Sequence, residues 1–220
     1  MRSTKLPSST FIGILAAVAG LLVWPGAASA QLGGLGGLLG GGGGGTPAPA
    51  VAGQAAAVQA TVFGLLGNTN LALANTGTLN GPTDARDASQ SSGNLLGALT
   101  ADVPQASTIG YPDQVDSAAS LANLALSIAG SSIGADFVSA QAQAVSGGAS
   151  SASSSLTNLS LNGVQIPVSG DPNQSIAIPG GTMIVNEQTS TPGGIVVNAL
   201  HVIVGGVADV AIGTATAAVQ

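Results

Sequence analysis

Apolar and polar residues alternate along most of the chain from Gln54 onward, as in ADFVSAQAQAV and GIVVNALHVIV. Side chains two residues apart lie on the same face of a β-strand, so this period buries one face of a strand and exposes the other. The alternating stretches have the length of strands and are separated by glycine, proline and asparagine. The pattern therefore predicts an all-β fold.

Turn residues divide the last third of the chain into hairpins. Asn162-Gly163 lies between LTNLSL and VQIPV, and Asn-Gly is the preferred pair for a type I′ turn because both positions tolerate positive φ. Further reversals are marked by Pro179-Gly180-Gly181, Pro192-Gly193-Gly194 and Gly205-Gly206. Turns this close together leave little room for crossover helices, so they predict an antiparallel meander.

Two segments are harder to assign. In DSAASLANLALSIAG, Leu121, Leu124 and Ile128 have helical spacing, but every second residue from Ala122 to Ile128 is also apolar, as in a strand. We favour a strand because the neighbouring segments are strands and glycine follows. In the second segment, Thr76 to Gly93, the sequence is polar and contains glycine, and we expect an exposed loop there.

Small aliphatic side chains must form the core. Beyond residue 30 the aromatic residues are Phe63, Tyr111 and Phe137, whereas alanine and glycine are abundant and cysteine is absent. Sheets packed through such side chains lie close together, without disulfides to stabilise them. We expect one all-β domain over residues 51–220, an antiparallel β-sandwich with a hairpin meander in its C-terminal third. The alternative is a β-solenoid or β-roll, for which no fixed repeat is visible.

Residues 1–30 have the three regions of a secretory signal peptide. Arg2 and Lys5 precede an apolar run, and Ala28-Ser29-Ala30 supplies the small residues that the peptidase accepts. The apolar run is shorter than the roughly 20 residues that cross a bilayer. We therefore expect cleavage after Ala30 and a mature chain without a transmembrane span. The protein should be secreted, either extracellular or at the cell surface, with the periplasm as the alternative.

Residues 31–50 are rich in glycine, leucine and proline. Glycine at this density loses too much conformational entropy on folding to hold one structure, and Pro47 and Pro49 favour an extended tether. We expect a flexible linker. The alternative is self-association through the leucines of this segment, which are Leu32, Leu35, Leu38 and Leu39.

Charge is sparse and mostly negative. The chain has nine acidic residues, and the expected mature part keeps Arg86 as its single basic residue. Such a chain cannot displace counterions from phosphates, which excludes nucleic acid as a partner. We expect its partners among cell-envelope or extracellular matrix components, or in further copies of the chain.

The single histidine, His201, and Asp209 lie on either side of Gly205-Gly206. A two-residue turn at these glycines pairs His201 with Val210, so His201 and Asp209 point to opposite faces of the sheet. A three-residue loop over residues 204–206 would bring them side by side, but it is less favoured for Gly-Gly. We therefore expect a strand histidine without a catalytic or metal-binding role.

Other reactive groups are few. A serine hydrolase needs a G-x-S-x-G turn, which is missing, and a zinc site needs more nitrogen or sulfur ligands than the chain has. Glycosidase chemistry could use the carboxylate pairs Asp84 with Asp87 or Asp113 with Asp116, but sugar clefts usually supply aromatic platforms. We expect no enzymatic activity and no cofactor, and we assign no catalytic, cofactor-binding or metal-binding residues.

Calcium is the ion that the remaining groups suit best. Loop oxygens come from Asp113, Asp116 and Asn123, or from Asp171 and Asn173, but no spacing matches an EF-hand loop. Asp-Pro-Asn is more typical of a turn whose side chains bond their own backbone.

One succession of motifs resembles a known family. SLTNLSLNGVQIPV is followed by MIVNEQ and then by GIVVNALHVIVGGVADVAIGTATA. This order resembles the C-terminal half of the choice-of-anchor P family of bacterial secreted proteins, and LLGALTADVPQAST fits its central strand region. The likeness extends roughly from Ala55 to Ala217. It implies an extracellular, mostly β domain without an assigned enzymatic activity, in which Asn198 and His201 belong to a strand.

These observations predict a non-catalytic structural or interaction module of the bacterial envelope or extracellular matrix, acting through strand edges and a surface of low charge. The alternative is a module that binds a surface ligand, either calcium or a polysaccharide. The sequence ends in TATAAVQ without a sorting motif or a hydrophobic tail. We therefore expect free secretion, or retention through the glycine-leucine segment or a partner.

Overall fold

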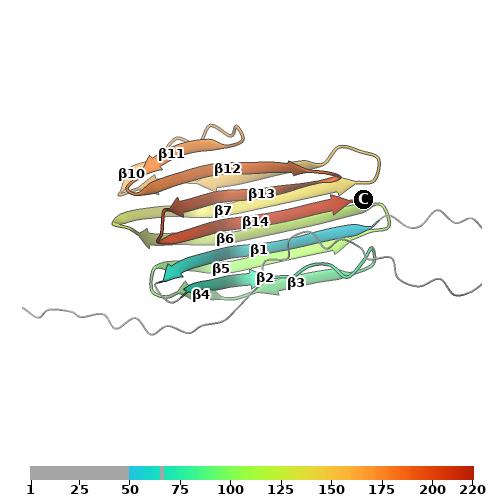
Figure 1. Cartoon of the computed structure of the whole chain (residues 1–220), viewed down its shortest axis with the longest axis horizontal. Helices are drawn as coiled ribbons and strands as arrows, with labels where there is room; N and C mark the ends of the chain where they lie inside the picture. The colour runs from blue at the N-terminus through green and yellow to red at the C-terminus, as the bar shows by residue number, and fades with distance from the viewer. Residues whose placement is uncertain (1–49, 65–66) are drawn as a thin grey trace, which may run out of the picture.

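A computed structural model describes residues 50–64 and 67–220. Within them every regular element is a β-strand, and the strands form two antiparallel sheets that lie face to face (Figure 1). The expected all-β antiparallel sandwich is confirmed. The expected signal peptide and the linker up to residue 49 lie outside the described residues. No helix in the described part is long and apolar enough to cross a membrane.

Sheet A is the six-stranded sheet, and sheet B is the eight-stranded one. In spatial order sheet A contains β11 (Gln174–Ile178), β12 (Gly181–Thr191), β13 (Gly194–Val204), β14 (Ala208–Val219), β1 (Val51–Gly64) and β2 (Gly67–Asn75). Sheet B contains β10 (Val164–Gln165), β9 (Ser160–Leu161), β7 (Ser131–Val145), β6 (Gln114–Ile128), β5 (Leu99–Gly110) and β3 (Ala85–Ser89), with β4 (Ser92–Leu95) also paired to β5 and β8 (Ser151–Thr157) to β7. The last four strands are consecutive neighbours in sheet A, so the predicted meander is confirmed.

The turn residues explain these hairpins. Asn162 and Gly163 both have positive φ, 53° and 78°, and the strands pair directly on either side, as in a type I′ turn. Pro179-Gly180 and Pro192-Gly193 also form two-residue turns. In each the glycine has positive φ, which a type II turn requires at its second central position.

The two ambiguous segments have different outcomes. The segment with both helical and strand spacing forms β6, as we favoured. The segment from Thr76 to Gly93 is not a single loop, because it contains β3 and the start of β4, both paired with β5. These strands lie at the margin of sheet B, where a strand needs few apolar residues, so their polar sequence is not distinguishable from that of a loop.

The core between the sheets consists of small and branched aliphatic residues. Ala55, Ala57, Val58, Leu200 and Ile212 have no exposed surface. The aromatic residues of the described chain are instead partly exposed, Phe63 by 38%, Tyr111 by 41% and Phe137 by 42%. The sandwich is therefore held together by many small buried contacts, as the composition predicts.

A hydrogen-bonded hydroxyl pair joins the two sheets inside this core. The hydroxyls of Ser117 on β6 and Thr108 on β5 are 2.6 Å apart, and Ser117 Oγ donates to the carbonyl of Thr216 on β14 at 2.7 Å. Because Ser117 uses its single proton for Thr216, Thr108 must be the donor within the pair. Both hydroxyls are buried, so each depends on the other for its hydrogen bonds.

We expect Ser117→Ala to lower the free energy of unfolding by about 1–2 kcal/mol, because the Thr108 hydroxyl and the Thr216 carbonyl would lose a partner in the core. Urea unfolding measures this change. Ser120→Ala, on the outer face of the same strand, is the control and should have almost no effect. Equal losses in the two variants would contradict a role for the inter-sheet hydrogen bond.

Candidate functional site

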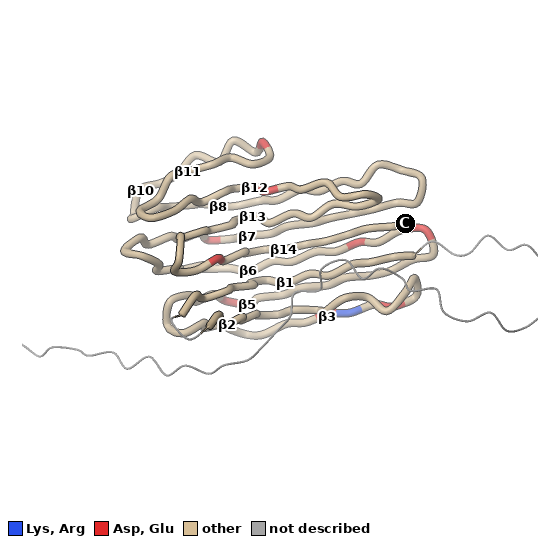
Figure 2. Tube along the Cα trace, viewed as in Figure 1, with Lys and Arg blue, Asp and Glu red and all other residues tan. Residues whose placement is uncertain are grey.

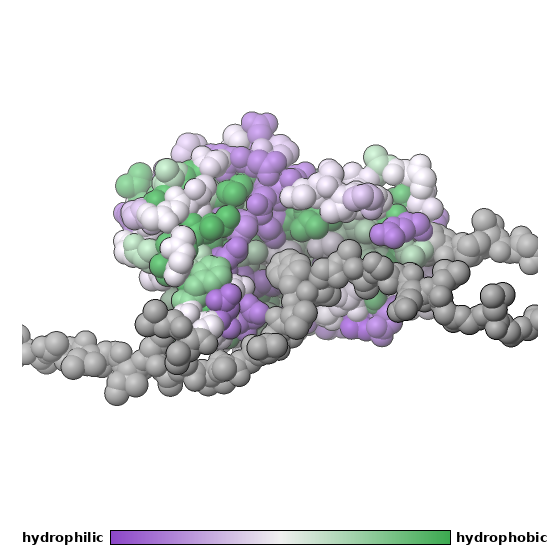
Figure 3. Space-filling model, viewed as in Figure 1, coloured by the Kyte–Doolittle hydropathy of each residue, from purple (hydrophilic) through white to green (hydrophobic). Residues whose placement is uncertain are grey.

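A cluster of polar and charged side chains lies on the outer face of sheet A. This carboxylate–histidine network comprises Glu187 on β12, Asn198 and His201 on β13, and Asp209 and Thr214 on β14. The residues on either side of His201 in β13 are buried in the core, so the imidazole is on the opposite, outer face. Figure 3 shows this face of the molecule, with hydrophilic side chains in a band across the strands between hydrophobic patches.

His201 and Asp209 meet because the loop between β13 and β14 is longer than we expected. The loop contains the three residues 205–207, and the pairing beyond it places Asp209 opposite Ile203. His201 is two residues from Ile203 and therefore on the same face, diagonal to Asp209. The prediction that His201 and Asp209 point to opposite faces is wrong. The middle glycine of the loop has a φ of 70°, a left-handed conformation that suits three-residue hairpin loops.

Asn198 shares this face because the alternation of side chains slips by one residue in the middle of the strands. Asn186 on β12 and Gly213 on β14 have φ values of 52° and 62°, and both lie opposite Ala199, where the ladder of paired residues is interrupted. Residues an odd number of positions apart, such as Asn198 and His201, can then point to the same side. This slip brings together side chains that a strict period of two would separate.

His201 lies between two carboxylates. Its Nε2 atom is 2.7 Å from Asp209 Oδ1, and its Nδ1 atom is 2.8 Å from Glu187 Oε2. The geometry at Nδ1 does not meet that of a hydrogen bond to Oε2, so Glu187 interacts with the imidazole through charge when the ring is protonated. Burial lowers the pKa of His201, but the hydrogen bond that Nε2 donates to Asp209 and the negative charges of Glu187 and Asp209 outweigh it, and the pKa is raised above its ordinary value.

Two further contacts hold Glu187 in place. Asn198 Nδ2 donates to Glu187 Oε2 at 2.6 Å, and Thr214 Oγ1 donates to Asn198 Oδ1 at 2.8 Å. The network therefore links three neighbouring strands across their outer face. Both ring nitrogens of His201 face carboxylates, which leaves neither free to accept a proton from a nucleophile.

The carboxylate pair Asp84 and Asp87 has no arrangement for acid catalysis. Asp84 accepts a hydrogen bond from the Asn80 backbone at 2.7 Å and one from Arg86 Nε at 2.8 Å. These two contacts, the backbone one above all, lower the pKa of Asp84. A glycosidase acid requires the opposite shift, toward a protonated carboxyl near neutral pH. Asp87 is exposed on β3.

The residues considered for calcium are not brought together. Asp116 and Asn123 are on the same strand, β6, seven residues and about 23 Å apart. Asp116 accepts hydrogen bonds from Gln114 and Gln143. In the part of the chain that the structure describes, no three His, Asp or Glu side chains gather in a way that could hold a metal ion.

The second calcium candidate lies in a turn, as its sequence predicts. Asn173 has a φ of 64°, and its Oδ1 accepts a hydrogen bond from the backbone N–H of Gln188 at 2.9 Å. The backbone N–H of Asp171 donates a hydrogen bond to the Ser169 hydroxyl oxygen at 3.2 Å. The Asn173 side chain is thus held by the backbone of β12, and the contact of Asp171 involves its backbone rather than its carboxylate.

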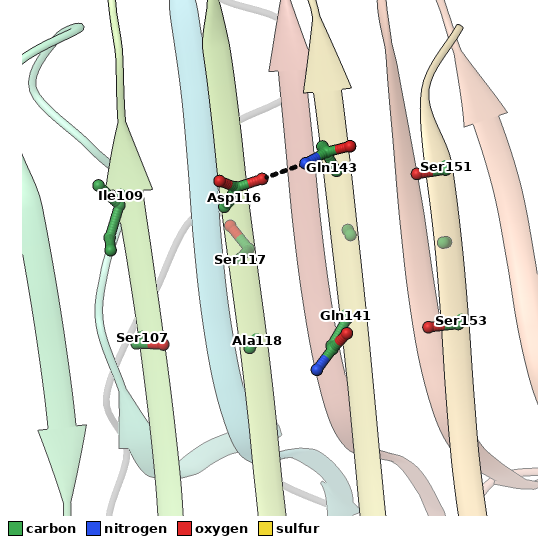
Figure 4. A pocket seen from close by; sticks show the side chains of 11 residues that line it. Ser107, Ile109, Asp116, Ser117, Ala118, Gln141, Gln143, Ser151 and Ser153 are labelled. Atoms are coloured by element: carbon green, nitrogen blue, oxygen red, sulfur yellow. Dashed lines mark hydrogen bonds between the residues drawn. The ribbon is translucent and has the colours of Figure 1, made fainter.

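A shallow groove lies on the outer face of sheet B, on the opposite side of the molecule from the network. It has a volume of about 470 Å³ and crosses β5, β6, β7 and β8 (Figure 4). Ala118 lies within it, and the polar groups along it are those of Ser107, Asp116, Gln141, Gln143, Ser151 and Ser153. The groove therefore offers hydroxyl and amide groups with little charge.

Sequence reasoning missed Glu187 and this groove. Glu187 follows Asn186 directly, and an asparagine inside a strand is the available signal of a left-handed residue and a change of face. The groove has no such signal, because its residues come from four strands, and pairing alone aligns Ser107 and Ser153 across the sheet with β6 and β7 between them.

Together these features define a β-sandwich with a charged network on one outer face and a polar groove on the other. The chain matches no protein-family model, and comparison with curated proteins and with solved structures finds no significant match. The function is therefore inferred from the residues described above.

Proposed function

We propose that this protein is a non-catalytic structural or interaction module of the bacterial envelope or extracellular matrix, secreted to the cell surface or beyond and similar to the choice-of-anchor P proteins. The observation that carries the proposal is that carboxylates already engage the single imidazole. Both nitrogens of His201 face carboxylates, in a network that links strands instead of opening to a substrate. This engagement of the imidazole supports a structural task for His201.

The surface supports the same proposal. Figure 2 shows acidic residues scattered over both sheets and, among the described residues, a single basic position on β3. The exposed residues of β7 and β8 in sheet B are mainly serine and glutamine, and the groove there is open and shallow. Broad sheet faces of low charge suit contacts with large, extended partners more than the enclosure of a small substrate.

The proposal is tested by cosedimentation of the secreted chain with cell envelopes isolated from the producing bacterium. We expect saturable binding that His201→Gln leaves unchanged when the variant is assayed at pH 9, because the stabilisation by a charged His201 is lost as pH rises. Binding no greater than that of an unrelated secreted protein of similar charge would overturn the proposal. An activity that His201→Gln abolishes, with folding intact, would do so as well.

A second function, polysaccharide binding, is favoured by one exposed aromatic ring. Phe137 is 42% exposed on the same outer face of β7 as Gln141 and Gln143, which line the groove. An exposed ring can stack on the apolar face of a sugar, while amides and hydroxyls bond its oxygens. These groups lie along one strand, with Phe137 about 13 Å from Gln141 and Gln141 about 7 Å from Gln143.

Affinity electrophoresis in gels containing the bacterium's own neutral polysaccharide tests this second function. Gln141→Ala should weaken binding about fivefold, the value of one hydrogen bond. Phe137→Ala should weaken it at least as much. Phe63→Ala removes an equally exposed ring from sheet A and is the control. Mobility that the polysaccharide does not retard, or that falls equally in all variants, would exclude the groove.

A further inference from the structure

The strand β2 forms one edge of sheet A, and this edge is unusual. Among the described strands β2 pairs with β1 alone, and its pairing runs without interruption from Gly67 to Leu73. On the outer side of the edge Asn68, Asn70 and Ala72 are exposed. An edge strand this long and regular presents a row of backbone N–H and C=O groups that another strand can pair with.

Edges of this kind are usually guarded, and the regular part of β2, Gly67 to Leu73, lacks the usual guards. The left-handed Ala74, with a φ of 44°, lies beyond it. Native proteins protect edge strands with lysine, proline, bulges or inward-pointing charges. The sequence of β2, GNTNLALAN, contains no charged residue and no proline. Sheet B ends at the same margin of the sandwich in β3, which carries Arg86 and Asp87 (Figures 1 and 2). Protective charges are thus present on the edge strand of sheet B and absent from β2, the edge strand of sheet A.

We infer that β2 pairs antiparallel with β2 of a second copy of this chain, across a two-fold axis at Asn70. This inference rests on the interaction role proposed above and names one partner for it. An antiparallel pair of identical strands places each side chain opposite a different residue of the second copy, except at the axis. With the axis at Asn70, Gly67 to Leu73 is paired over its whole regular length.

The residues of β2 are complementary to themselves in this register. Asn68 faces Ala72 of the second copy on the outer side, and Thr69 faces Leu71 on the inner side. The half-buried Thr69 and Leu71 therefore extend the inner side, and the exposed Asn68 and Ala72 extend the outer side, as they do within each copy. No like charges meet at any position, whereas a charged strand paired with its own copy places like charges near the axis. A partner of another class would need a charge or a pocket to be selected, and β2 offers neither.

The test is sedimentation velocity of the secreted chain over a concentration series, at 0.15 M salt. We expect reversible dimers. In the double variant Asn68→Lys with Ala72→Lys, lysines face each other at two places across the axis, and dimerisation should weaken about tenfold or more. Both positions are exposed in the single chain, so its fold and melting temperature should not change.

A charge-reversed variant shows whether the register is the one proposed. Asn68→Lys with Ala72→Glu places opposite charges at the same two contacts, and it should dimerise at least as well as the natural chain. Ala125→Lys with Ser127→Lys is the control for added positive charge, because both residues are exposed on the central strand β6 of sheet B. It should leave dimerisation as it is.

Each outcome decides between the inference and the proposed function. A monomer at every concentration, or dimers that all three variants affect equally, overturns the pairing through β2. If the same preparations still bind cell envelopes, the proposed interaction function stands, but a second copy of the chain is not its partner. If dimers form as expected but envelopes are not bound, the pairing stands and the envelope role falls.

Discussion

Replacing Gly53 with valine is expected to lower the free energy of unfolding by about 3 kcal/mol, because the side chain would be forced between the two sheets. A Cβ atom at this position would lie 2.6 Å from both Thr108 Oγ1 and Val115 Cγ1 of the facing sheet. Real Cβ atoms do not approach other atoms this closely, so the sheets would have to move apart. The sandwich is thin at this point because glycine and alanine line it.

Thermal and urea unfolding measure the effect, and Gly81→Val is the matched control. Gly81 does not have positive φ, and a Cβ there would meet no atom within 4 Å. Its replacement should change stability by no more than about 0.5 kcal/mol. If Gly53→Val were as stable as Gly81→Val, the close approach of the sheets would not limit what the core accepts.

Stability is expected to fall as pH rises from 6 to 9, because of His201. The pKa of His201 is raised in the folded chain above its ordinary value of 6.5. The charged imidazole therefore stabilises the fold fully at pH values below 6.5, and this contribution is lost as pH rises through the higher folded pKa. Urea unfolding at a series of pH values measures the decline.

His201→Gln should abolish most of this decline. At pH 5 the variant should be less stable than the natural chain by about 1.5–3 kcal/mol, the range for hydrogen bonds to charged groups. At pH 9 the difference should be small. Glu187→Gln keeps the imidazole but removes one carboxylate, so it should weaken the pH dependence without abolishing it. A natural chain with the same stability at pH 6 and pH 9 would contradict a charged His201 in the network.

The strands and most of the turns follow from neighbouring residues in the sequence. The alternation in β6 and β7 predicts strands because burial of one face requires it, and Asn162-Gly163 forms the expected turn because both positions have positive φ. The margin strand β3 was not predicted, since its partner β5 supplies most of the apolar surface. The partition of the strands into two sheets, and the pairing of β1 with β14, also depend on contacts between distant segments.

The candidate site shows more clearly what the sequence alone could not predict. His201 and Asp209 are both visible in the sequence, but whether they meet depends on one residue of loop length between β13 and β14. The preference of Gly-Gly for a two-residue turn is worth too little to withstand the packing of two whole strands. Glu187 reaches the same imidazole only because the alternation slips at Asn186.

The sequence by itself determined that this chain is an all-β protein with hairpins in its C-terminal third and a core of small side chains. These properties depend on each residue's own conformational preference and on the period of burial, which are local. Only the tertiary structure decided which polar residues share a face, where the sheets touch and which edge is left unguarded. Those properties depend on register, which is set by the sum of all pairings across a strand and not by any stretch of sequence read alone.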